Sequence, residues 1–97
     1  MRARFDEADL RDASLEYADL QRASLRGARL DFANVSNARL LQADLRAVRL
    51  DGASLRNASL GRANLSGATL AGTNTERADA DGAILDPGVE IKGSPHG

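Results

Sequence analysis

The chain has 97 residues, of which 42% are hydrophobic, and its thirteen Lys and Arg against fourteen Asp and Glu give a formal net charge of −1. This length suits one domain, and the absence of cysteine excludes disulfide, thiol-nucleophile and zinc-finger chemistry. No apolar stretch approaches a membrane span and the N-terminus lacks a signal-type segment, so we expect a cytoplasmic protein that does not bind membranes.

An Ala-x-Leu pattern returns every five residues from Ala3 to Leu85, with no insertion or deletion. On an α-helix a five-residue step rotates a side chain by roughly 500°, so successive leucines would form no apolar stripe. In an extended chain, positions two apart share a face, and Ala23 and Leu25 can both point inward. Ala28 points inward too only if the chain bends once per repeat. The period therefore predicts a coil with Leu and Ala on its inner wall.

Glycine or asparagine recurs two positions after the large residue of the repeat. Both residues adopt turn geometry at low steric cost. This register predicts the bends at Gly27, Asn37, Gly52, Asn57, Gly67, Gly72 and Gly82.

Several repeats match a known motif, Ala-(Asp/Asn)-Leu-x-x. They include Ala18-Asp19-Leu20, Ala43-Asp44-Leu45 and Ala63-Asn64-Leu65-Ser66-Gly67. On these residues the chain resembles the pentapeptide-repeat family. The resemblance implies an all-β fold, a right-handed quadrilateral parallel β-helix with four repeats per coil and about four coils. The square cross-section rests on the resemblance alone, because the period permits other polygons.

The repeat weakens towards its end, where Thr73, Thr75 and Ala80 replace larger inward residues. We expect the β-helix to occupy residues 1–86. Proline lacks the donor that a ladder requires, so a turn at residues 86–88 should stop the solenoid. Residues 87–97 would form this turn and a mostly disordered tail, with residues 89–91 folding over the last coil as a cap.

The first coil has no comparable cap, and Phe5 would lie at an exposed edge. Such edges are usually covered or paired, which suggests a homodimer formed end to end through the first coil. Two alternatives remain: the chain is a fragment, or residues 1–4 cover the edge themselves.

Residues twenty apart should stack on successive coils. Arg26 then lies under Arg46, and Arg29 under Arg49, so these four residues should gather around one corner; we call them the arginine patch. Asp31, Asp44 and Asp51 border it. One interpretation is a contact for phosphate or for an acidic partner. The other is a charge lattice neutralised by lateral ion pairs.

The sequence offers no catalytic constellation and no cofactor motif. Residues 79–82 resemble the start of a calcium loop but lack the later ligands, so we expect no metal site. His96 is the last residue but one, where nothing fixes its geometry as a base. The serines of the polar positions have no histidine nearby, and an enzyme is the least expected class.

These observations favour a non-catalytic β-solenoid that acts as a structural scaffold or as an interaction module for an unidentified protein partner. The family resemblance implies an alternative, since some members mimic duplex DNA and protect DNA gyrase from quinolones. That mechanism needs a strongly anionic rod, whereas acidic and basic residues nearly cancel here. Nucleic-acid binding is a third and weaker interpretation, because aromatic stacking groups are scarce.

Overall fold

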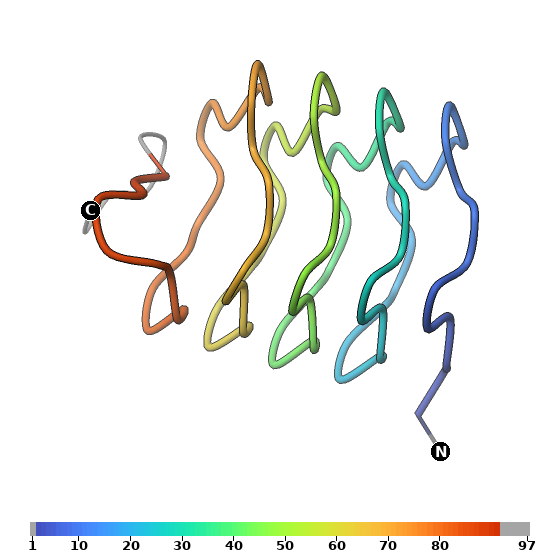
Figure 1. Ribbon diagram of the computed structural model, residues 1–97, viewed down its shortest axis with the longest axis horizontal. Helices are drawn as coiled ribbons and strands as arrows, with labels where there is room; N and C mark the ends of the chain where they lie inside the picture. Colours follow the sequence, from blue (N-terminus) through green and yellow to red (C-terminus); the bar gives the residue numbers. More distant parts are fainter. Residues whose placement is uncertain (1, 92–97) are drawn as a thin grey trace.

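The structure, a computed structural model, describes residues 2–91 as a coil that winds around one axis (Figure 1). Within this range there is no helix and no strand longer than a single bridge residue. Thirteen isolated parallel bridges replace continuous strands, and every one joins residue i to residue i+20. Each coil therefore holds four five-residue repeats, and the predicted twenty-residue stacking is confirmed.

The bridge residues fall in four columns, which define four faces of the rod. Face A carries positions 4, 24, 44, 64 and 84; face B 9, 29, 49 and 69; face C 14, 34, 54 and 74; and face D 19, 39, 59 and 79. Backbone hydrogen bonds join each coil to the next, such as Leu25 N to Asp44 O at 2.8 Å and Asp44 N to Ala23 O at 2.9 Å. Neighbouring coils thus satisfy one another's backbone groups.

A tight turn forms each corner between two faces. In one of them the Ala28 amide donates to the Leu25 carbonyl at 3.0 Å, which closes a four-residue turn. The third residue of the turn has positive φ at every repeat from Glu7 to Gly82, with values between 57° and 74°. All seven predicted glycine and asparagine turn positions lie here. Eleven of these positions carry a residue other than glycine, for which this backbone region costs roughly 1–2 kcal/mol.

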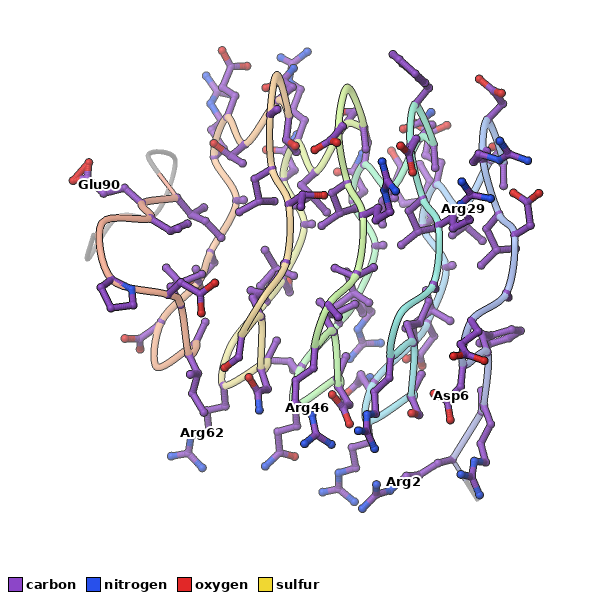
Figure 2. All side chains as sticks on the ribbon, viewed as in Figure 1. Arg2, Asp6, Arg29, Arg46, Arg62 and Glu90 are labelled. Carbon is purple, nitrogen blue, oxygen red and sulfur yellow. The ribbon has the colours of Figure 1, made fainter. Side chains whose placement is uncertain are left out.

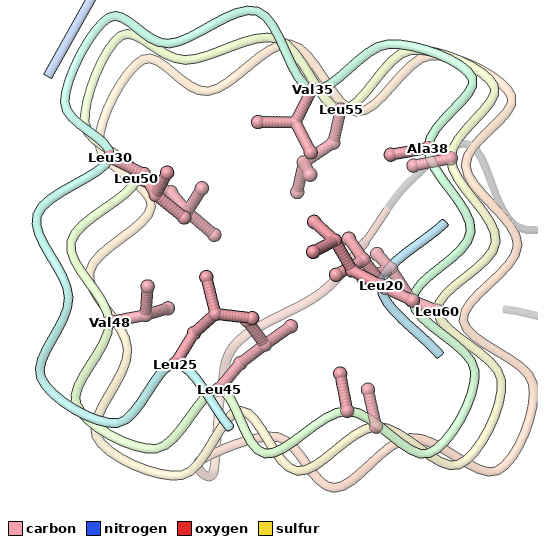
Figure 3. Close-up of a cluster of buried hydrophobic side chains, with 14 of the residues drawn as sticks. Leu20, Leu25, Leu30, Val35, Ala38, Leu45, Val48, Leu50, Leu55 and Leu60 are labelled. Atoms are coloured by element: carbon pink, nitrogen blue, oxygen red, sulfur yellow. The ribbon is translucent and has the colours of Figure 1, made fainter. Parts of the chain in front are cut away.

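The interior is a column of leucines and alanines. Figure 3 shows Leu25 with Leu45, Leu30 with Leu50, and Val35 with Leu55, each pair stacked at one side of a four-sided cross-section. Leu25, Leu45 and Leu65 are at most 2% exposed. The predicted inward assignment is confirmed.

One backbone amide per repeat, at the position after the leucine, has no backbone acceptor within residues 2–91 and is often bound by a side chain. Asn64 Oδ1 accepts from the Ser66 amide at 3.0 Å, and Asp44 Oδ1 accepts from the Arg46 amide at 3.2 Å. An Asp or Asn just before the leucine is placed to fill this role. This contact gives a physical reason for the acidic or amide residue in Ala-(Asp/Asn)-Leu.

The C-terminal end of the described chain packs on the last coil. Val89 N donates to Asp86 O at 3.0 Å, and Gly88 at φ 86° follows Pro87, a combination typical of a type II turn. Beyond it, Ile91 is 4% exposed and joins the core cluster. The expected disordered tail, including His96, lies outside the described residues from position 92 onward.

Candidate interaction surface

The arginine patch divides between a corner and a face. Arg26 and Arg46 lie in the turns between faces A and B, and together they line a shallow depression. Arg29 and Arg49 form a parallel bridge on face B. In Figure 2, Arg46 lies at the lower edge of the rod while Arg29 lies in its upper half. The structure therefore brings the four residues together as two pairs.

Lateral ion pairs engage three of these four side chains. Arg46 Nη2 lies 2.7 Å from Asp44 Oδ2, and Arg26 Nε lies 4.0 Å from the same atom. Arg49 Nε lies 3.8 Å from Asp31 Oδ2. The hydrogen bonds from Arg46, ahead of the attraction of Arg26, lower the pKa of Asp44. Much of the patch is thus compensated within the chain.

Arg4 on face A and Asp6 in the adjoining A/B turn are two more compensated groups. Asp6 accepts hydrogen bonds from the Ser24 hydroxyl and from the Arg26 amide, the latter at 3.2 Å, and its carboxylate lies 3.6 Å from Arg4 Nη2. The Ser24 hydrogen bond, with smaller contributions from Arg26 and Arg4, lowers the pKa of Asp6. Acidic groups on face A and in the adjoining A/B turn therefore engage Arg4, Arg26 and Arg46.

A second basic row was not singled out from the sequence. Three arginines, Arg2, Arg22 and Arg62, lie at intervals of the coil period on the corner between faces D and A, with Gln42 between the last two. None of the three forms an ion pair with another residue in the range 2–91. Figure 2 shows Arg2 and Arg62 along one lower edge of the rod. The sequence contains this row, because the three arginines occupy the third turn position of repeats that are multiples of four apart.

The D/A corner is hollowed along its length. One depression of about 620 Å³ and another of about 550 Å³ share Gln21, Arg22 and Gln42, so they form one continuous trough. We call it the corner groove; its other lining residues are Arg2, Leu41, Gly61, Arg62, Asp79 and Asp81. The missing side chain at Gly61 makes room for Leu41, whose Cδ2 would lie 2.7 Å from a Cβ added there.

Phe5, the residue predicted to mediate an end-to-end contact, is 37% exposed on the first coil. Tyr17 and Phe32, which are both exposed, project from different corners. Over residues 2–91 there is no group of three or more His, Cys, Asp and Glu able to hold a metal ion. The same part of the chain contains no helix long and apolar enough to cross a membrane.

Comparison with known proteins identifies the family. The family model described as pentapeptide repeats (8 copies) matches this sequence over four overlapping ranges, residues 3–42, 23–62, 39–74 and 58–86. The chain belongs to the pentapeptide-repeat family. Its fold is the right-handed parallel β-helix of that family, as the resemblance implied. No curated protein sequence matches it.

Solved pentapeptide-repeat proteins from cyanobacteria share this fold. Alr5209 from Nostoc PCC 7120 is 39% identical, with a TM-score of 0.76 over 77% of this chain and 62% of its own. HetL from the same organism, a protein involved in heterocyst differentiation regulation, is 39% identical, with a TM-score of 0.69 over 87% of this chain and 43% of its own. Rfr23 from Cyanothece 51142 is 37% identical, with a TM-score of 0.62 over 84% of this chain and 58% of its own. The present chain thus spans about two-fifths to three-fifths of these structures.

Proposed function

We propose that this pentapeptide-repeat chain is a non-catalytic interaction module that presents a stiff surface to a protein partner. The observation that carries the proposal is the unbroken twenty-residue register of its parallel bridges, which stacks side chains in straight rows on four faces and four corners. A surface built this way is held in place by neighbouring coils and needs little ordering when a partner binds.

Charge is segregated over this surface in spite of the nearly neutral total. The D/A corner, with Arg2, holds three arginines and one aspartate, whereas the turns of the diagonally opposite corner hold one arginine and three aspartates. Complementary charge sets orientation and partner choice more than raw affinity. Such a rod can distinguish a partner that meets one corner from a partner that meets the other.

Gyrase protection by DNA mimicry is the weaker alternative. It requires an anionic rod, and this chain carries arginines along the A/B corner and the D/A corner. A gyrase supercoiling assay with a fluoroquinolone, run with and without the protein, tests it directly. Restoration of supercoiling by the protein would favour gyrase as the partner.

Affinity capture followed by reconstitution tests the interaction module. The immobilised chain should retain a protein from the source cell, and the purified pair should bind in isothermal titration calorimetry. Leu45→Asp places a charge in the core and serves as an unfolded control. The proposal is wrong if no retained protein binds the purified chain, or if the unfolded control binds it equally well.

A further inference from the structure

We propose that the corner groove binds an extended acidic segment of a partner protein. This inference deepens the proposed function, on which it rests, by assigning the surface and the chemistry of its ligand. It is separate from the arginine patch, where lateral aspartates already engage three of the four arginines.

The groove offers guanidinium groups that have no carboxylate partner in the described part of the chain. Arg2 and Arg22 line its first half, and Arg62 lines the second. The Arg22 Nε atom donates to Gln42 Oε1 at 3.1 Å, a contact that orients this side chain along the row. Arg62 lies against the last coil, where its Cγ would be 3.3 Å from a Cβ added at Gly82. Arg22 and Arg62 are therefore held by neighbouring residues, and Arg2 continues the row on the first coil.

Their spacing fits an extended chain. Successive coils of a parallel β-structure lie about 4.8 Å apart, so Arg2 and Arg62, three coils apart, are separated by roughly 14 Å. Side chains on one face of an extended strand repeat at about 6.6 Å, and three of them span roughly 13 Å. Arg22 lies one coil, about 4.8 Å, from Arg2 and two coils, about 9.6 Å, from Arg62. The outer two of three alternate acidic residues would thus face Arg2 and Arg62, and the middle one would lie within about 2 Å of the level of Arg22.

The remaining lining groups suit a peptide. Gln21 and Gln42 supply amide donors and acceptors that can meet a peptide backbone. Leu41, 38% exposed, supplies an apolar contact beside the notch at Gly61. Asp79 and Asp81 close the far end with negative charge, which disfavours a continuous polyanion running along the whole groove. An acidic peptide of limited length is therefore a better fit than nucleic acid.

Fluorescence anisotropy with a labelled peptide of alternating glutamate and serine tests the inference. The intact chain should bind it at low ionic strength, and binding should weaken at about 0.15 M salt, where exposed charges are screened beyond about 8 Å. The double variant Arg22→Gln, Arg62→Gln should weaken binding about tenfold. The peptide with glutamine in place of glutamate should not bind.

Arg77→Gln is the matched control. Arg77 occupies the same turn position as Arg22 and Arg62, with φ of 58° against 62° and 57°, but it lies on the corner between faces C and D. Arg77→Gln removes one positive charge, as the single variant Arg62→Gln does, and should leave peptide affinity within about twofold. An equal loss in Arg77→Gln and Arg62→Gln would show that net charge alone drives binding, and would overturn the inference.

Other outcomes would overturn it as well. Tighter binding of a duplex oligonucleotide, lost in the double variant, would assign the groove to a phosphate backbone. Self-association of the intact chain that disappears in the double variant would assign it to a second copy. If the peptide fails to bind while a captured partner still binds the intact chain, this inference falls and the proposed function stands.

Discussion

Arg46 folds back onto Asp44, two residues earlier, and donates two hydrogen bonds to its carboxylate at 2.8 and 2.7 Å. The leucine between them points into the core, so the pair lies on the outside of the coil around a corner. Asp9 and Arg11 repeat the same geometry on the first coil, at 2.8 and 2.7 Å. In both cases an aspartate bonds the arginine within its own repeat.

Acid should destabilise the protein through Asp44. Hydrogen bonds from Arg46 hold its pKa below the ordinary value of 3.8. A carboxyl with a depressed folded-state pKa stabilises the fold above its unfolded pKa, and this contribution is lost as pH falls through the folded value. Asp44→Asn should therefore reduce the difference in the free energy of unfolding between pH 7 and about pH 2.5. Urea titrations at the two pH values measure it, and an unchanged difference would contradict the assignment.

Leu45→Ala should cost about 2–5 kcal/mol, because the side chain is buried between Leu25 and Leu65 on the adjacent coils. Arg46→Ala, one residue along, removes a half-exposed ion pair and should cost about 1 kcal/mol or less. Urea unfolding monitored by circular dichroism compares the two variants. Equal losses would contradict the inward and outward assignment.

Ala47→Gly should stabilise the protein by up to about 1 kcal/mol. Ala47 has φ of 58°, a conformation that strains any residue with a Cβ and that glycine adopts freely. Ala43→Gly is the control, since Ala43 is buried, lacks positive φ and would lose a packed methyl group. Thermal unfolding should move the two melting temperatures in opposite directions. A fall for both would show that strain at the corner is negligible.

Asn64→Ala should cost about 1 kcal/mol, because it removes the acceptor for both the amide and the hydroxyl of Ser66, at 3.0 and 2.7 Å. Asn64→Asp keeps an acceptor in the same place and should retain most of that stability. Chemical denaturation of both variants measures the difference. Comparable losses would rule out the corner hydrogen bonds as the cause.

The end-to-end dimer predicted from the sequence depends on Phe5. If it forms, the chain should show a dimer mass by light scattering at micromolar concentration, and Phe5→Ser should shift it to the monomer. Removal of one exposed aromatic side chain is expected to leave the coils behind it intact. A monomer mass for the unaltered chain removes the dimer.

The five-residue period was enough to predict the bend in every repeat, the inward leucines and the turn positions, since each follows from the alternation of side chains along an extended chain. Four repeats per coil came from the family resemblance, and the bridges from Arg4 to Ser24 onward confirmed it. The stacking of Leu25 and Leu45 could be predicted, because an uninterrupted repeat keeps the same register on every coil.

Which charged groups meet was decided only by the tertiary structure. The twenty-residue stacking predicted from the sequence puts Asp9 under Arg29, and the backbone bridge between them forms, yet the Asp9 carboxylate accepts hydrogen bonds from Arg11. The period determines where each Cα lies. An ion pair depends in addition on the conformations of long side chains at a corner, which change the distance between their charged groups by several ångströms. For the same reason only the folded structure revealed the hollow at Gly61 and the lack of a carboxylate partner for Arg22 among residues 2–91.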